Sequence, residues 1–287
     1  MTHKTYKKIA IILAVGAVLA VGGYYAAALN GFFGGGGTIP EDTMTRGLVG
    51  YWSMDEGSGQ TAFDASGNSN NGRLGSSSTA DVSDPKWSKG KNGGGMSFDG
   101  KDDYVDILTP SILKPTTQYL TIEAWIKPQN LTGSHFAVTE AWCTDFRIGT
   151  NGSKAEAFIW TSDDAENVQS NTSLSTNNWY HIVMTYDNLT LKLYLNGKFE
   201  NSGIEDGPVG NIETYIYIGS NKAGCGNAYP FSGSIDDVRI YNRALSAEEV
   251  RYHYNRGGPV AEWKFDEGSG TAVYDSSGNE FDGVLHE

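Results

Sequence analysis

The sequence has few cysteines, fewer basic than acidic residues, and little that is typical of an amphipathic helix. Only two of its 287 residues are cysteines, Cys143 and Cys225, and the absence of any Cys-x-x-Cys spacing argues against zinc. Lysine and arginine together number 21 against 34 aspartates and glutamates, which gives a net charge of −13. We expect no nucleic-acid partner, because no basic patch is available to neutralise phosphates.

Sequence patterns that carry catalysis are also missing. Glycoside hydrolysis needs two carboxylates at a fixed separation, and no Glu-x-Asp-x-x-Glu pattern occurs. Asp236 and Asp237 are adjacent, so on a regular strand they would point to opposite faces. His135, His181 and His253 fit no zinc-protease spacing, and there is no nucleophile elbow. The sequence therefore predicts a protein that is not an enzyme.

The residues that are abundant favour an all-β fold. The chain contains 37 glycines, 16 tyrosines and 7 tryptophans; glycine serves turns and aromatic residues favour strands. Short alternating runs recur between turn signals, and many antiparallel strands without helical crossovers imply a sandwich or jelly roll. The expected strands are Tyr119–Lys127, Phe136–Ala141, Asp145–Thr150, Ala155–Thr161, Trp179–Tyr186, Leu189–Leu195, Lys198–Asn201, Thr214–Ile218 and Ser234–Tyr241.

One helix is expected at Ser246–Asn255, after the last strand. Ser246 followed by Glu249 is a capping box, in which each side chain bonds the other residue's backbone amide. Gly257 and Pro259 end the helix.

The N-terminal residues 1–30 read as a transmembrane anchor or a signal peptide. Ile9–Leu29 contains no charged side chain, is long enough to cross a bilayer as a helix, and follows three lysines that favour the cytoplasmic side. Ala26-Ala27-Ala28 leaves open the alternative of a cleavage site. Either reading gives an extracytoplasmic location, membrane-anchored or secreted, with residues 31–46 as a glycine-rich linker.

An internal repeat sets the expected domain boundaries. The segment that begins at Val49 and contains Trp52-Ser-Met-Asp55-Glu56-Gly57 returns 211 residues later, without gaps, as Val260 to Gly268 and beyond. A period of this length is that of a whole domain. We therefore expect one complete domain at 47–257 and the incomplete start of a second copy at 258–287.

Several motifs together resemble a known family. They are Trp52-Ser-Met-Asp-Glu-Gly-Ser-Gly, Phe98-Asp-Gly-Lys-Asp-Asp-Tyr104, Thr121-Ile-Glu-Ala-Trp125-Ile, Asn178-Trp179-Tyr-His-Ile-Val and Gly233-Ser-Ile-Asp236-Asp237-Val. In this order they resemble the laminin-G-like, concanavalin A-like jelly-roll domains of bacteria and archaea, over all of 47–257. The resemblance implies a two-sheet antiparallel jelly-roll sandwich and extracellular binding, often of glycans or surface partners.

A structural calcium ion is a second implication of the resemblance, since related domains often carry one. Asp64, Asn68, Asp236 and Asp237 are the best oxygen ligands in the matched motifs. By alternation Asp236 shares a face with Val238 and Ile240, where a carboxylate needs a partner or an ion. The alternative is that these side chains accept hydrogen bonds from loop amides and form turns.

The expected ligand-binding residues lie near the cysteines. In an oxidising compartment Cys143 and Cys225 are expected to form a disulfide, the alternative being two buried thiols. A disulfide would gather Trp142, Asp145, Arg147 and Tyr229 at one site, with Trp160 close by in the sequence. Stacking of exposed aromatic rings on sugars is the expected mechanism; ordinary packing around a bridge is the alternative.

These observations together predict an adhesion module that binds a glycan or a surface protein. A structural subunit of an envelope layer or filament is the alternative, in which the copy at 258–287 pairs with a neighbouring subunit to form a homo-oligomer. A non-catalytic accessory domain of a glycosidase is a third reading.

Overall fold

The computed structural model describes residues 44–77, 79–82, 84–108, 118–140, 145–161, 164–209, 215–220, 229–256, 262–265, 267–275 and 282–285. They fall into two units, Thr45–Val250 and a second one that includes the C-terminal residues. Ile9–Leu29, the expected anchor or signal segment, lies outside the described residues, as do Trp142, Cys143 and Cys225. Within the described ranges, no helix combines the length and apolarity that crossing a membrane requires.

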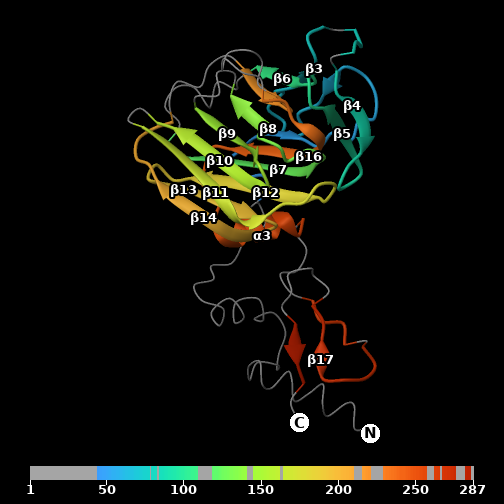
Figure 1. Cartoon of the computed structure of the whole chain (residues 1–287), viewed down its shortest axis with the longest axis vertical. Coiled ribbons are helices and arrows are strands. Elements are labelled where there is room, and N and C mark those ends of the chain that lie inside the picture. The colour runs from blue at the N-terminus through green and yellow to red at the C-terminus, as the bar shows by residue number, and fades with distance from the viewer. Residues whose placement is uncertain are drawn as a thin grey trace. The chain divides into compact units, whose positions relative to one another are not determined.

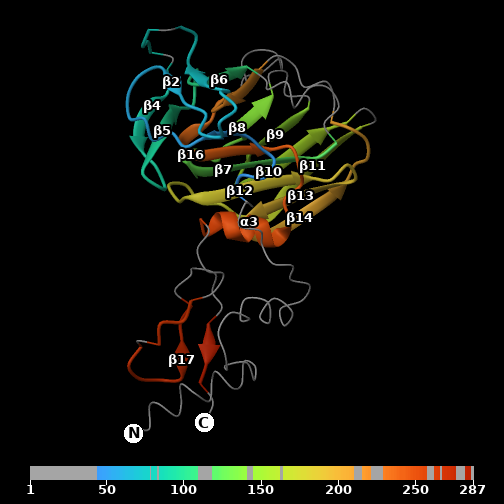
Figure 2. The same ribbon diagram turned by 180° about the vertical axis from the view of Figure 1, so that it is seen from behind.

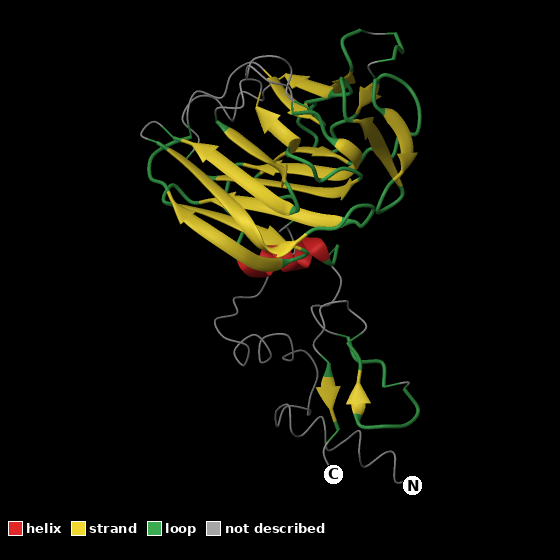
Figure 3. Cartoon of the chain, viewed as in Figure 1, coloured by secondary structure: helices red, strands yellow, loops and turns green. Residues whose placement is uncertain are grey.

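Thr45–Val250 is built from two antiparallel sheets that face each other, as the alternating sequence pattern predicts (Figures 1 and 3). Sheet A has the order β14-β13-β12-β7-β16-β5-β4, with β1 also paired to β16. Its strands are β1 (Leu48–Trp52), β4 (Lys86–Lys89), β5 (Gly94–Asp99), β7 (Leu120–Pro128), β12 (Tyr180–Tyr186), β13 (Thr190–Leu195), β14 (Lys198–Ile204) and β16 (Ser232–Tyr241).

Sheet B has the order β11-β10-β9-β8-β15-β6-β3-β2. Its strands are β2 (Thr61–Ala62), β3 (Gly72–Leu74), β6 (Val105–Leu108), β8 (Ser134–Glu140), β9 (Phe146–Asn151), β10 (Lys154–Trp160), β11 (Ala165–Ser173) and β15 (Tyr215–Ile218). All nine strands expected from the sequence are present, with ends that differ by a few residues.

The core lies between the inner faces of the two sheets. Alternate residues of the strands enter it, such as Ile122 and Ala124 of β7 in sheet A and Ile148 and Ala157 in sheet B, and all four are fully buried. Because the side-chain period of a strand is two, the residues between them lie on the outer faces. These outer faces are where a ligand can reach the domain.

The helix α3 (Ala247–Tyr254) begins after Ser246 and covers part of the outer face of sheet A (Figure 2). The expected capping box is confirmed: the Glu249 amide donates to Ser246 Oγ at 3.2 Å and the Ser246 amide donates to Glu249 Oε2 at 2.9 Å. Val250 packs with Val183 and Tyr241 of the sheet in a small second cluster.

Asp236 does not share a face with Val238 and Ile240, so the alternation argument is wrong here. Strand β16 contains a bulge at Asp237, whose φ of 50° is left-handed, and its register against β7 shifts between Asp236 and Arg239. Asp236 is therefore opposite Trp125, on the outer side of sheet A, while Val238 is in the core.

The described residues of the second unit include a short hairpin, β17 (Ala272–Val273) with β18 (Gly283–Val284). It reproduces local contacts of the first repeat: the Glu262 amide donates to Asp275 as the Tyr51 amide does to Asp64. Met54 and its counterpart Phe265 share a φ of 56°. The repeat seen in the sequence is therefore also a repeat of local structure.

Candidate functional site

The outer face of sheet B carries a continuous row of side chains that crosses the strands. Strand register places each member opposite the next, from β10 to β3. We call this the floor row: Phe158, Arg147, Thr139, Tyr217, Asp106 and Arg73. All are buried except Arg147 and Arg73, so the row is a packed surface rather than a set of free side chains.

Arg147 is held between two aromatic rings on this face. Its guanidinium carbon lies 3.6 Å from the ring centroid of Phe158 and 5.0 Å from that of Phe136, and its Nε donates to Glu156 at 3.3 Å. Burial lowers the pKa of Arg147, and Glu156 opposes that effect. A guanidinium stacked on two rings and bonded to a carboxylate has one geometry, so it forms a rigid part of the face.

Glu156 is fixed from three sides. Besides Arg147, the side-chain amides of Asn151 and Gln169 donate to Glu156 Oε2, at 2.9 Å and 3.4 Å respectively. Glu156 is only 3 % exposed. Its charge is therefore already compensated within the face.

A second row of side chains lies two residues further along the same strands. Trp160, Asp145, Tyr215 and Leu108 each stand two positions from a member of the floor row, and so on the same face. We call these four the rim row. Three of its members face solvent: Trp160 is 45 % exposed, Tyr215 36 % and Leu108 63 %. Asp145 is buried, and its backbone oxygen accepts from the Trp160 amide.

Tyrosines support the part of the face around β15. The rings of Tyr215 and Tyr217 are stacked with centroids 6.1 Å apart, and Tyr217 meets Tyr104 edge to face at 5.6 Å. Further along, Arg73 is paired with Asp106. The exposed Tyr215 ring is therefore stacked against a packed neighbour on the same face.

Most of the expected binding residues lie on this face. Asp145, Arg147 and Trp160 come from neighbouring strands, and Tyr229 packs on Phe136 with ring centroids 4.9 Å apart. Trp142 and the expected Cys143–Cys225 bridge lie outside the described residues. The structure thus brings the four described residues to one region of sheet B.

Sequence reasoning missed several residues of the face, among them Phe136, Glu156, Phe158 and Tyr215. The alternation in Ala155–Thr161 places Glu156, Phe158 and Trp160 on one side of a strand, which is a usable signal. The partners from β8 and β15 have no such signal, because strand order is a property of the fold.

Asp64 and Asn68, two of the expected calcium ligands, form a turn. The Asp64 carboxylate accepts from the amides of Tyr51, Ser66 and Asn70 at 2.9–3.0 Å, and Asn68 donates to backbone oxygens of Leu48 and Val49. Burial alone would raise the pKa of Asp64, but hydrogen bonds from Ser66 and from the backbone amides of Tyr51 and Asn70 together lower it. These bonds make both side chains part of the turn, and a calcium ion at Asp64 and Asn68 stays a prediction of the sequence.

Asp236 and Asp237 lie on the same side of β16 and share Asn92 as a donor. The Asn92 amide donates to Asp236 Oδ2 at 2.9 Å and its side chain to Asp237 Oδ2 at 2.8 Å. Asp237 also accepts from Tyr51 at 2.6 Å and Arg239 at 3.1 Å. Asp236 Oδ1 is buried with no hydrogen-bond partner, so of the four expected ligands this carboxylate alone has a free buried oxygen.

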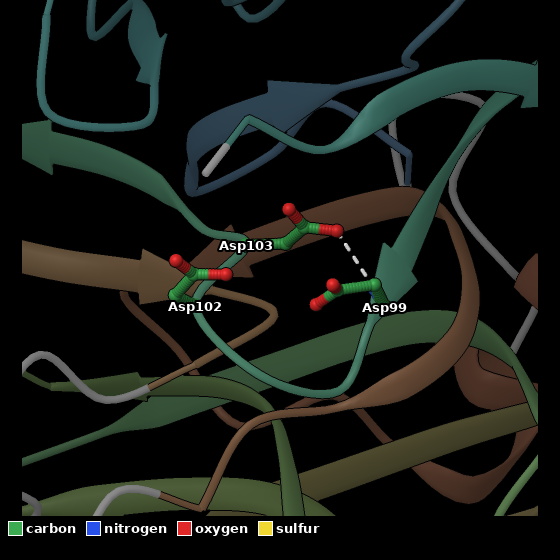
Figure 4. A group of neighbouring side chains, drawn as sticks. All are labelled: Asp99, Asp102 and Asp103. Atoms are coloured by element: carbon green, nitrogen blue, oxygen red, sulfur yellow. Dashed lines mark hydrogen bonds between the residues drawn. The ribbon is translucent and has the colours of Figure 1, made fainter. Parts of the chain in front are cut away.

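A different acidic group meets the distance requirement of a metal site. Asp99, Asp102 and Asp103 each have a carboxylate oxygen within 4.8 Å of the others (Figure 4). Asp103 accepts from the Asp99 amide at 2.7 Å, and burial raises the pKa of Asp103 to about 6. The three expected carboxylate ligands, Asp64, Asp236 and Asp237, form no such group among the described residues.

Comparison with known proteins identifies the fold. Residues 99–251, more than half of the chain, match the family described as the concanavalin A-like lectin/glucanases superfamily. No curated protein sequence matches. Domain 4 of AbnA, a GH43 extracellular arabinanase from Geobacillus stearothermophilus in complex with arabinotriose, is similar with a TM-score of 0.57 and 23 % identity, over 71 % of this chain and 96 % of that one.

Two toxin binding domains are similar over about half of their own length. That of Paraclostridial Mosquitocidal Protein 1 has a TM-score of 0.58 and 16 % identity over 74 % of this chain and 53 % of its own. That of Botulinum Neurotoxin DC in complex with SialylT has a TM-score of 0.57 and 14 % identity over 77 % and 54 %. At these identities the likeness is one of fold. The family match shows that the chain belongs to the concanavalin A-like lectin/glucanases superfamily.

Proposed function

We propose that this protein is an extracytoplasmic carbohydrate-binding module and that the outer face of sheet B holds the sugar. The observation that carries the proposal is the position of Trp160 and Tyr215, two exposed aromatic rings in the rim row beside a packed floor row on the same face. Sugar rings present C–H faces that stack on aromatic planes, while fixed polar groups orient their hydroxyls.

The floor row supports this function because it is already ordered. Arg147 is held by Phe136, Phe158 and Glu156, and Tyr215 is stacked on Tyr217. A ligand that binds an ordered surface loses less free energy to the immobilisation of side chains.

The structural neighbours support the same class of ligand. The arabinanase domain was solved with arabinotriose, and one toxin binding domain was solved with SialylT. The arabinanase domain is part of an enzyme, so an accessory role beside a catalytic domain is also compatible with this fold. The location outside the cytoplasm rests on the apolar segment Ile9–Leu29.

Replacing the rim-row rings tests the proposal. Trp160→Ala and Tyr215→Ala should each lower the affinity for a bound glycan by at least about tenfold, a loss typical of a binding hot spot. Phe199→Ala is the matched control, since Phe199 is 55 % exposed but lies on β14 of sheet A. The 287-residue chain is screened on a glycan array, and hits are measured by calorimetry after thermal melting shows that each variant is folded. Glycan binding that survives both rim-row substitutions would place the site elsewhere.

A structural subunit is the second candidate, and one observation favours it. The C-terminal unit repeats the local contacts of the segment that opens the larger unit, as the Asp64 and Asp275 bonds show. Such a copy could occupy the corresponding position in a neighbouring molecule.

A further inference from the structure

The described basic side chains of the outer face of sheet B are each engaged by a neighbour on that face. Arg147 is paired with Glu156, and Arg73 with Asp106. Lys154 is the first residue of β10 and lies on the same face. Its Nζ donates to the backbone oxygen of Asn171. Within the described part of this face, both arginines are therefore already paired with carboxylates, and Lys154 already donates one hydrogen bond to the backbone.

The charge of the whole chain acts in the same direction. A net charge of −13 repels a polyanionic glycan at long range, and it has no effect on the approach of a neutral one. The chemistry of the face, aromatic rings beside compensated ion pairs, is suited to hydroxyls and C–H groups rather than to carboxylates.

The spacing of the rings defines the shape of the ligand. Trp160 is on β10 and Tyr215 on β15, with β9 and β8 between them in the sheet. Neighbouring strands are ~4.8 Å apart, so three intervals separate the two rings by roughly 14 Å along the rim row. A single sugar or a disaccharide is too short to cover both rings.

We propose, on the basis of the carbohydrate-binding function above, that the rim row binds a neutral, linear oligosaccharide longer than a disaccharide. The oligosaccharide lies across strands β10, β9, β8 and β15, with different sugar units on Trp160 and Tyr215. Recognition is of an internal stretch of a polysaccharide rather than of one terminal sugar.

Calorimetry of the 287-residue chain with oligosaccharides of increasing length tests this inference. The probes are arabino-, xylo-, cello- and manno-oligosaccharides from disaccharide to hexasaccharide, with oligogalacturonides and sialyllactose as acidic counterparts. For a neutral series that binds, the affinity should rise at least about tenfold from the disaccharide to the length that reaches both rings, and then level off. Trp160→Ala and Tyr215→Ala should each abolish this rise, while Phe199→Ala should keep it.

Three outcomes would overturn the inference. They are equal affinity for disaccharide and hexasaccharide, tighter binding of the acidic probes, and failure of all four neutral series. In the first two, the loss of binding in Trp160→Ala would leave the carbohydrate-binding function of the face standing. Binding of no glycan on the array or in solution would instead remove that function itself.

Discussion

The guanidinium of Arg147 lies 3.6 Å from the ring centroid of Phe158, the residue opposite it on β10. Arg147 also balances the buried carboxylate of Glu156. Arg147→Ala should lower the free energy of unfolding by about 2–3 kcal/mol, because it leaves that carboxylate without its cation. Arg147→Lys keeps the charge and loses the planar stack, so its free energy of unfolding should lie between those of the parent and of Arg147→Ala. Urea denaturation checks this order, and an alanine variant as stable as the parent would contradict it.

A second buried charge network lies on the outer face of sheet A. Arg239 donates to Glu123 at 3.2 Å and to Asp237 at 3.1 Å, and both carboxylates are buried. Arg239→Met should cost about 3–5 kcal/mol of stability, because two buried carboxylates lose their shared cation. Tyr51→Phe is the milder comparison: it removes one hydrogen bond to Asp237 and should cost about 1 kcal/mol. If the two variants prove equally stable in denaturation, the network does not act as described.

Burial raises the pKa of Asp236 from 3.8 to about 7, and this predicts a pH dependence of stability. Between these values the folded chain binds more protons at this group than the unfolded chain. Its contribution is therefore fully present below 3.8 and is lost as the pH rises through about 7.

Asp236→Asn cannot ionise, so relative to the parent it should gain stability as the pH rises from about 4 to about 7, and the gain should level off above that. Thermal melting in EDTA measures the difference. The control Asp64→Asn has the opposite sign, because the pKa of Asp64 is lowered: its deficit should shrink as the pH falls. A difference between Asp236→Asn and parent that is constant with pH would show that the Asp236 carboxyl titrates normally.

Calcium remains a prediction of the sequence, and among its expected ligands Asp236 is the carboxylate with a buried oxygen still to be satisfied. If Asp236 contributes to a calcium site, adding calcium to the EDTA-treated chain should raise the melting temperature of the parent and leave that of Asp236→Asn unchanged. If calcium binds instead at Asp99, Asp102 and Asp103, Asp99→Asn should lose the rise in melting temperature and Asp236→Asn should keep it. A melting temperature that does not respond to calcium in the parent would remove the ion from the account.

Exchange of the C-terminal copy between molecules meets a steric difficulty at Gly50. A Cβ added there would lie 2.3 Å from the ring of Trp52, and the copy has Ala261 at the equivalent position. Gly50→Ala should therefore destabilise the domain by about 1–3 kcal/mol through overpacking.

Deleting 258–287 should leave the oligomeric state unchanged. The mass measured by light scattering should fall only by the mass of the deleted residues. A deletion that dissociates an oligomer would instead support the structural-subunit candidate.

The sequence predicted the strands with strong alternation well and missed those without it. Strand β11 (Ala165–Ser173) is at the edge of sheet B, where most of its side chains are exposed, so no apolar alternation marks it. The bulge at Asp237 was also missed, because one residue in the left-handed region reverses the alternation that follows.

Part of the candidate site could be read from the sequence. Trp160 and Arg147 were expected there because aromatic and charged residues near the cysteines fell outside the shared motifs. Tyr215 and Phe136 could not be assigned to the site, because β15 and β8 become neighbours only through the order of strands in sheet B.

Hydroxyl-radical footprinting of the 287-residue chain, with and without a saturating neutral oligosaccharide from the length series, shows which aromatic rings the sugar covers. We expect Trp160 and Tyr215 to become protected in the complex, while Phe199 and Phe63, which are more exposed than either, remain as reactive as in the free chain. Protection of Phe199 or Phe63 with no change at Trp160 and Tyr215 would contradict it.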